Sequence, residues 1–235
     1  DGLLTDVRGA MKTGVTVAPM IDGRAAGAKT QPLASPIDGR KVCDVAEVDV
    51  TMAARAVDAA SAGFAKWSAM GVATRAAILD RAGDLLEERR AAFLALLQTE
   101  GGKTLDDALS EWREAIDYCR YYAAQARLTL SPQPMPGPTG ESNELRYRGR
   151  GVFVCISPWN FPLAIFLGQV TAALVAGNAV VAKPAEQTPI IATEAVKLLH
   201  EAGIPKSALQ LVIGDGAVGA KLIADRCVAG AAFTG

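Results

Sequence analysis

An asparagine held between two prolines is the residue of this chain best suited to chemistry on a carbonyl group. Asn160 lies in the string Ser-Pro-Trp-Asn-Phe-Pro-Leu at 157–163, directly after the apolar run 152–156. Pro158 and Pro162 restrict the backbone on both sides of it. An amide N–H fixed in this way can donate to the oxygen of a tetrahedral intermediate. A turn asparagine that bonds to its own backbone is the competing interpretation.

A lysine and a glutamate mark a second motif. Lys183 follows the apolar residues 179–182, and Glu186 lies in the next loop, before Thr188-Pro189 opens a helix. In open α/β sheets, ligands bind outside the carboxyl ends of the strands. A cation and a carboxylate there can bond to sugar hydroxyls, and a helix N-terminus attracts phosphate. The alternative is a solvated lysine and glutamate in an ordinary strand-to-helix loop.

A glycine-rich turn is a third candidate. The string Gly-Asp-Gly-Ala-Val-Gly at 214–219 follows an apolar strand and opens a helix, as a GxGxxG dinucleotide-binding fingerprint does. Gly214 and Gly216 are the candidate residues. A lone fingerprint is a weak signal, and a glycine-rich turn without a ligand is its alternative.

The elements that must position these motifs alternate between strand and helix. Apolar runs predict strands at 152–156, 179–183, 209–213 and 231–233, and helices at 162–176, 189–202 and 217–224. Such alternation is typical of an α/β fold with a parallel sheet.

The first half of the chain differs in its pattern. Residues 1–36 are rich in Gly, Pro, Ala and Thr, which predicts an extended arm with short strands around 15–21. Helical periodicity then predicts segments at 49–67, from a cap at Thr74 to Gly101-Gly102, and at 104–127. The proline-rich and glycine-rich stretch 128–150, with alternation at 143–148, predicts a protruding β-hairpin.

Composition excludes several classes of protein. The 235 residues are 50% hydrophobic and 21% charged, which predicts a sizeable core rather than disorder. A net charge of -1 gives no basic surface for nucleic acid or an anionic membrane. The apolar runs are shorter than the roughly 18 residues that span a bilayer.

The cysteines favour structural roles. Four of them are widely spaced without a CxxC pair, and His200 is the single histidine, so we expect no metal site and no Cys/His catalytic pair. Cysteines of this kind fit a reducing, cytoplasmic setting.

The first two motifs together closely resemble the aldehyde dehydrogenase superfamily, and the resemblance covers about 20–235. It implies a Rossmann-like NAD-binding domain, with Asn160 as an oxyanion donor and Lys183 and Glu186 holding the adenosine ribose. Phe161 would line the aldehyde pocket, or otherwise be a core aromatic. In the family, a cysteine nucleophile and a general-base glutamate complete the mechanism.

The same resemblance extends the candidate cofactor site. Phe233-Thr234-Gly235 matches the start of the family's Phe-Thr-Gly-Ser motif, which meets the pyrophosphate. The family usually has one more residue between its second and third glycines, which puts Gly214 and Gly216 in doubt. The candidate cofactor-binding residues are Ile156, Ser157, Pro158, Trp159, Lys183, Glu186, Gly214, Gly216, Phe233, Thr234 and Gly235.

Two segments, 113–123 and 136–143, resemble the dehydrogenase domain of bifunctional proline utilization A proteins. That domain oxidises L-glutamate γ-semialdehyde to glutamate with NAD, and an FAD-containing proline dehydrogenase domain precedes it. The implied organisation is an arm at 1–36, a helical part at 37–127, an oligomerisation hairpin at 128–150 and an incomplete Rossmann-like part at 151–235.

None of the four cysteines stands in the family's nucleophile motif. We therefore expect this chain to be the N-terminal half of a longer enzyme and to be inactive alone. The alternatives are an aldehyde dehydrogenase for another aldehyde, and a non-catalytic nucleotide-binding or assembly module.

Overall fold

The computed structural model describes residues 2–10, 15–27 and 29–235. A six-stranded sheet with the order β11-β8-β9-β10-β2-β3 lies at the centre of these residues. Its strands are β2 (Met20–Ile21), β3 (Arg24–Ala25), β8 (Val152–Ile156), β9 (Ala179–Lys183), β10 (Leu209–Leu211) and β11 (Val228–Phe233). The four strands from β11 to β10 are parallel, which confirms the predicted α/β fold with a parallel sheet.

The arm contributes more to the fold than the sequence predicts. Short strands occur near 15–21 as expected, but β2 also pairs antiparallel with β10 and so extends the central sheet. A helix, α1 (Gly2–Ala10), precedes them and was not predicted. A second sheet has the order β1-β5-β4, made of β1 (Val15–Val17), β4 (Lys29–Ala34) and β5 (Lys41–Glu47).

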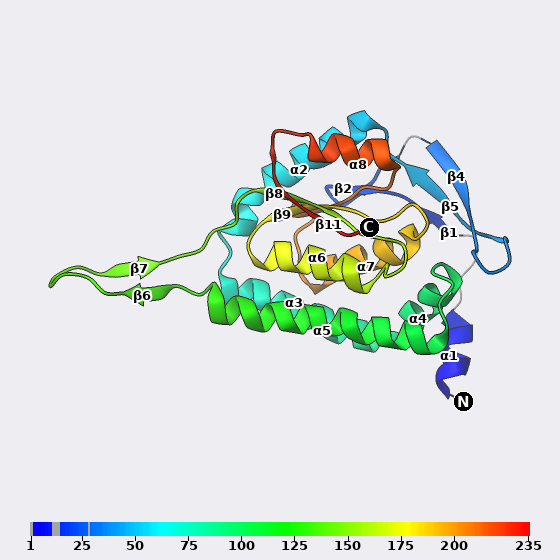
Figure 1. The fold of residues 1–235 in the computed structure, drawn as a ribbon, viewed down its shortest axis with the longest axis horizontal. Helices are drawn as coiled ribbons and strands as arrows, with labels where there is room; N and C mark the ends of the chain where they lie inside the picture. Colours follow the sequence, from blue (N-terminus) through cyan, green and yellow to red (C-terminus); the bar gives the residue numbers. More distant parts are fainter. Residues whose placement is uncertain (1, 11–14, 28) are drawn as a thin grey trace.

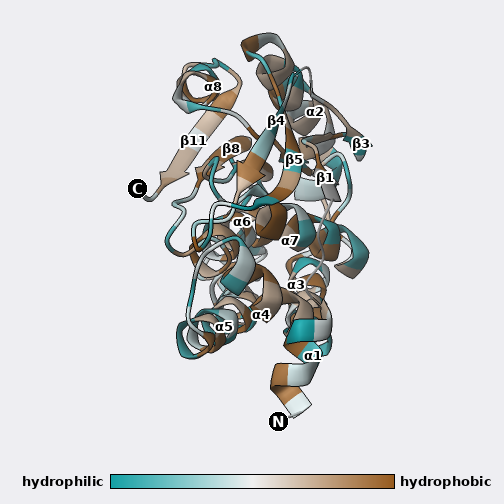
Figure 2. Cartoon of the chain, turned by 90° about the vertical axis from the view of Figure 1, so that its right-hand side faces the viewer, coloured by the Kyte–Doolittle hydropathy of each residue, from teal (hydrophilic) through white to brown (hydrophobic). Residues whose placement is uncertain are grey.

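Helices cover both faces of the central sheet (Figures 1 and 2). One face packs against α2 (Val50–Ser68) and α8 (Gly216–Ile223), and the other against α6 (Ala164–Val175) and α7 (Pro189–Ala202). Successive side chains of β8 point to opposite faces of the sheet, so Val152 and Val154 pack on the α2 side while Cys155 packs on the α6 side.

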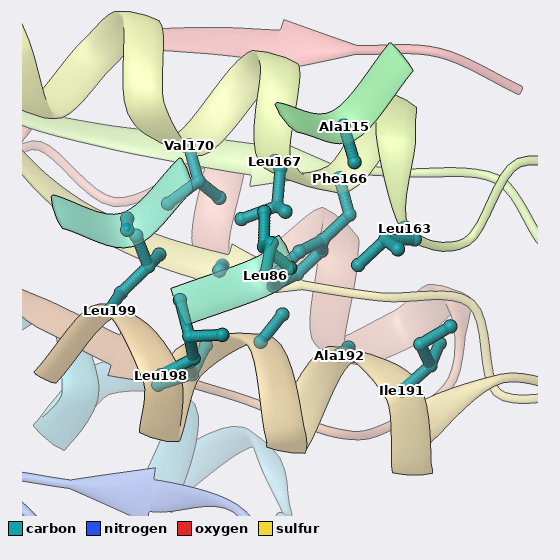
Figure 3. Close-up of a cluster of buried hydrophobic side chains, with 14 of the residues drawn as sticks. Leu86, Ala115, Leu163, Phe166, Leu167, Val170, Ile191, Ala192, Leu198 and Leu199 are labelled. Atoms are coloured by element: carbon teal, nitrogen blue, oxygen red, sulfur yellow. The ribbon is translucent and has the colours of Figure 1, made fainter. Parts of the chain in front are cut away.

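A further helical layer packs beneath α6 and α7. It consists of α3 (Val72–Glu88), α4 (Arg90–Thr99) and α5 (Leu105–Thr129). Figure 3 shows side chains of α6 and α7 projecting toward one another around Leu86 of α3. This buried cluster fixes where the N-terminal ends of α6 and α7 lie.

The predicted helices are present, but the helical region predicted from Thr74 to Gly101-Gly102 differs in its start and in its continuity. Thr74 does not cap a helix, because α3 begins earlier, at Val72, and the helical region breaks at Arg89 between α3 and α4. Asp49 caps α2 by accepting the N–H of Met52 at 2.8 Å, and Thr104 caps α5.

The predicted hairpin projects from the body of the molecule (Figure 1). Its strands are β6 (Gln133–Met135) and β7 (Asn143–Leu145), so β7 is shorter than the predicted 143–148. Every residue from 132 to 148 is exposed. In the described part of the chain, no helix combines the length and apolar character needed to cross a membrane.

Candidate functional site

A cavity of about 620 Å³ opens at the carboxyl ends of β8, β9 and β11. It is lined by Ile156, Ser157, Pro158, Trp159, Asn160, Phe161, Ile165, Lys183, Ala185, Glu186, Gln187, Phe233, Thr234 and Gly235. Parallel strands bring their carboxyl ends to one edge, so segments far apart in sequence converge here. The structure thus brings together every predicted site residue except Gly214 and Gly216.

The loop after β8, residues 157–162, forms one side of the cavity. We call it the substrate-side loop. Trp159 and Phe161 are 58% and 39% exposed, and Asn160 between them is also exposed. The N–H of Ser157 donates to the carbonyl oxygen of Lys183 at 3.2 Å, which ties this loop to the end of β9.

The helix that follows this loop is capped by a glutamate from α5. Glu111 Oε1 accepts the N–H groups of Leu163 and Ala164 at 2.8 and 3.1 Å. Its other carboxylate oxygen pairs with Lys103 Nζ at 2.7 Å, and that ammonium lies 4.1 Å from the centroid of the Phe161 ring. Neither Glu111 nor Lys103 was predicted from the sequence.

A signal for Glu111 exists in the sequence. It lies at helical spacing between Ala108 and Ala115, which are both buried, and so places a carboxylate on the apolar face of α5. Carboxylates are almost never fully buried unless they are paired. An acidic residue on an apolar helix face therefore indicates a buried partner, although it does not identify that partner.

The loop after β9, residues 184–188, forms the other side. We call it the cofactor-side loop. Lys183 is only 5% exposed, and its Nζ lies 3.4 Å from the Pro184 carbonyl oxygen and 3.7 Å from Glu186 Oε1. Gly219 faces the lysine stem, because a Cβ built there would lie 3.6 Å from Lys183 Cδ.

A buried glutamate also caps the helix after the cofactor-side loop. Glu100 accepts the N–H groups of Ile190 and Ile191 at 2.6 and 2.8 Å. Burial raises the pKa of Glu100 to about 8, although these two N–H groups favour the carboxylate. Thr188 stands at the N-cap position, as the opening of a helix at Thr188-Pro189 predicts, but its buried side chain makes no capping bond and Glu100 supplies both acceptors.

The third edge of the cavity is the end of β11. Phe233 is 67% exposed, and the N–H of Thr234 donates to the Ile156 carbonyl oxygen at 3.1 Å. The hydroxyl of Thr234 accepts from Gln169 Nε2 at 2.9 Å. Residues 233–235 therefore lie directly beside the end of β8.

The glycine-rich turn lies outside the cavity lining. Asp215 caps α8 by accepting the N–H groups of Ala217 and Val218. A Cβ on Gly214 would lie 2.8 Å from a methyl carbon of Val218, so this position needs a small residue for packing. Gly216 faces open space. The packing of Gly214 is consistent with a tight turn and does not itself indicate a ligand.

The cysteines contribute no group to this cavity. Burial raises the pKa of Cys43, Cys119 and Cys155 to about 12, so their thiols stay protonated near neutral pH. Cys227 is exposed in the turn after α8. Among the described residues, no group of three or more His, Cys, Asp or Glu side chains is placed to hold a metal ion.

The strand order and the cavity at the strand ends define an open α/β domain with a parallel sheet, in which ligands bind outside the carboxyl ends of the strands. Residues 24–235 match the model of the aldehyde dehydrogenase family. The chain belongs to the aldehyde dehydrogenase family.

Individual relatives are consistent with that assignment. The bifunctional protein PutA of Rhizobium meliloti is 56% identical over 164 residues, covering 70% of this chain and 12% of PutA. The 1-pyrroline-5-carboxylate dehydrogenase of Anoxybacillus flavithermus is 42% identical over 173 residues, covering 74% of this chain and 34% of that enzyme. A crystal structure of proline utilization A from Bradyrhizobium japonicum superimposes with a TM-score of 0.82 at 58% identity, covering 99% of this chain and 21% of that one. The chain thus spans a minor part of the relatives that it matches.

Proposed function

We propose that this chain forms the cofactor-binding domain of an NAD-dependent dehydrogenase that oxidises L-glutamate γ-semialdehyde to L-glutamate in proline catabolism. One observation carries the proposal: Asn160, Phe161, Lys183 and Glu186 line a single cavity at the strand ends. The names of the relatives, PutA and 1-pyrroline-5-carboxylate dehydrogenase, support this substrate.

The residues around Lys183 fit the ribose of a dinucleotide. The protein contacts of Lys183 Nζ, at 3.4 and 3.7 Å, are long for hydrogen bonds, so its N–H groups remain able to bind hydroxyl oxygens. Glu186 is partly exposed beside it and can accept from the same hydroxyls. When bound, NAD supplies the acceptor for the substrate hydride.

The substrate-side loop supplies the groups that would contact the aldehyde. The exposed amide of Asn160 can donate to the aldehyde oxygen as negative charge develops on it. The Phe161 ring, also at the cavity surface, offers an apolar wall for the substrate chain. Both residues would orient the substrate and stabilise charge, and neither is a nucleophile.

We assign the nucleophile and the general base to parts of the enzyme outside these residues. The three buried thiols are poor nucleophiles because their pKa values are raised to about 12, and Cys227 does not line the cavity. The 235-residue chain alone should therefore produce no NADH from NAD and glutamate semialdehyde. One equivalent of NADH per chain would make one of its own cysteines the nucleophile.

The proposed organisation has four parts: an arm at 1–36, a helical part at 37–127, an assembly hairpin at 128–150 and a Rossmann-like part at 151–235. The enzyme would be cytoplasmic, and FAD would be bound only by a separate proline dehydrogenase domain. The exposed hairpin would pair with another copy, since an exposed edge strand invites pairing. Light scattering of a variant without 130–148 tests this pairing, and an unchanged assembly contradicts it.

The substrate assignment is tested by comparing kcat/KM of the complete enzyme for glutamate semialdehyde with kcat/KM for short aliphatic and aromatic aldehydes. Glutamate semialdehyde should be preferred clearly. A preference for the simple aldehydes would support an aldehyde dehydrogenase but contradict the assignment of glutamate semialdehyde as its substrate. No oxidation of any aldehyde would favour a non-catalytic nucleotide-binding module instead.

A further inference from the structure

Glu111, on α5 of the helical layer, binds the residues that directly follow the substrate-side loop. Its side chain is fully buried, and Oε1 accepts the N–H groups of Leu163 and Ala164 at 2.8 and 3.1 Å. Backbone N–H groups in the first turn of a helix have no partner within that helix. Glu111 therefore fixes Leu163 and Ala164, at the start of α6, which lie three and four residues after Asn160.

Lys103 continues the contact from Glu111 to the cavity surface. Its ammonium lies between Glu111 Oε2, at 2.7 Å, and the Phe161 ring, whose centroid is 4.1 Å away. The side chain is 12% exposed. The turn between α4 and α5 holds the lysine in place, because its N–H donates to the Leu97 carbonyl oxygen at 3.2 Å and Gly102 adopts a φ of 66°.

We propose that Glu111 and Lys103 act as a positioning pair that fixes Asn160 and Phe161 for the aldehyde step, an inference that rests on the function proposed above. The carboxylate holds the C-terminal end of the loop through the N–H groups of α6. The ammonium holds the Phe161 ring through a cation–π contact. Donors that are fixed before the reaction stabilise developing charge without reorganising.

A comparison with Glu100 separates this role from simple helix capping. Glu100 uses both carboxylate oxygens for the N–H groups of Ile190 and Ile191. Glu111 uses one oxygen for the cap and the other for Lys103. Glu111→Gln can therefore keep the capping oxygen and replace the second oxygen by an NH2 group, which removes the partner of the ammonium.

The test uses Glu111→Gln, Lys103→Met and the double variant in the complete enzyme. Each single substitution should lower kcat with the aldehyde by about tenfold, as expected for a misplaced reacting group. The double variant should lose no more than either single variant, because one contact is broken in all three. The Kd for NAD, measured by calorimetry, should stay within about twofold of the wild-type value, because the pair holds the C-terminal end of the loop, at 161–164. The candidate cofactor-binding residues 157–159 lie at its other end, which the Ser157 N–H ties to Lys183 of β9.

The matched control is Glu194→Gln, in a pair with Lys197 that has the same 2.7 Å separation but lies exposed on α7. It should leave kcat unchanged. Equal kcat losses in Glu111→Gln and Glu100→Gln would reduce Glu111 to a generic cap and overturn the proposal. Unchanged kcat in both single variants, or additive losses in the double variant, would also overturn it.

Trp159 provides a measurement that does not depend on activity. It is 58% exposed, whereas Trp67 and Trp112 are 1% and 8% exposed. The part of the acrylamide quenching that Trp159→Phe removes therefore reports on the substrate-side loop of the complete enzyme. Quenching should change in both single variants and not in Glu194→Gln. If the wild-type enzyme oxidises no aldehyde, the proposed function fails, and quenching still decides whether the pair positions the loop. If Glu111→Gln does not fold, quenching and kcat of Lys103→Met, at its partly exposed position, decide whether the pair acts as proposed.

Discussion

The substrate-side and cofactor-side loops follow neighbouring parallel strands, yet they present their polar groups in opposite ways. The first exposes the amide of Asn160 at the cavity surface, whereas Lys183, the residue directly before the second, is only 5% exposed. Both are followed by a helix whose first N–H groups are bound by a buried glutamate from the helical layer. In the proposed function, the same scaffold would support an open surface for the substrate and a recessed cation for the cofactor.

Removing the exposed amide should have the largest effect. Asn160→Ala in the complete enzyme should lower turnover by about 10²–10³-fold, the usual result of losing one oxyanion donor. The Kd for NAD should remain unchanged, because the amide faces the aldehyde. Steady-state kinetics at saturating NAD measures this, with the exposed hairpin substitution Asn143→Ala as the control. A variant with normal turnover would remove Asn160 from the mechanism.

Removing the recessed cation should have a smaller effect on a different quantity. Lys183→Ala should weaken NAD binding by about 10- to 100-fold, since hydrogen bonds to charged groups contribute about 1.5–3 kcal/mol. Glu186→Ala should weaken it less, because its carboxylate is more exposed. Calorimetric titration with NAD distinguishes these variants from Lys221→Ala, an exposed lysine on α8. Unchanged affinity in both variants would remove Lys183 and Glu186 from the cofactor site.

Glu100, which caps the helix after the cofactor-side loop, should make the free energy of unfolding depend on pH. The pKa of Glu100 is raised from 4.5 to about 8 in the folded chain, chiefly by burial, so the folded state holds a proton that the unfolded state releases. The free energy of unfolding should therefore fall as pH rises between these values. The slope is at most about 1.4 kcal/mol per pH unit.

Glu100→Gln should remove that slope between pH 5 and 8, whatever constant cost the lost N–H contact adds. Urea unfolding of the 235-residue chain at several pH values measures the slope. Glu201→Gln is the control. Its hydrogen bond with Arg89 lowers the pKa of Glu201 from 4.5, so ionisation of Glu201 changes stability only at pH values below 4.5, outside the range tested. Parallel pH profiles for wild type and Glu100→Gln would show that Glu100 is ionised in the folded state.

Local pattern was sufficient to predict the strands that carry the site. Strands β8 and β9 and helix α7 have the predicted bounds. The two strands are short apolar runs, and α7 is an amphipathic segment that begins at Pro189 and ends before Gly203. Most residues that line the cavity belong to the two motifs directly after those strands, and Phe233, Thr234 and Gly235 belong to a third motif at the end of β11. Ile165, Ala185 and Gln187 also line the cavity and were not predicted as site residues.

Contacts between distant segments could not be predicted in this way. Glu111 and Leu163 are 52 positions apart, and Glu100 and Ile190 are 90 positions apart. The position of Glu111 on an apolar helix face indicates a buried partner, but a cap from so far away leaves no signal in the sequence that identifies this partner. The pairing of Met20 with Leu211 was missed for the same reason.

The projecting hairpin makes the chain easy to cut at one place. Residues 132–148 are exposed throughout and include Arg146 and Arg148, which are trypsin sites in a segment without a buried core. Trypsin should nick a free chain there long before it reaches the sheet. A second copy lying over the hairpin would slow that cleavage, so the rate of nicking as a function of protein concentration becomes a direct record of how the molecules associate.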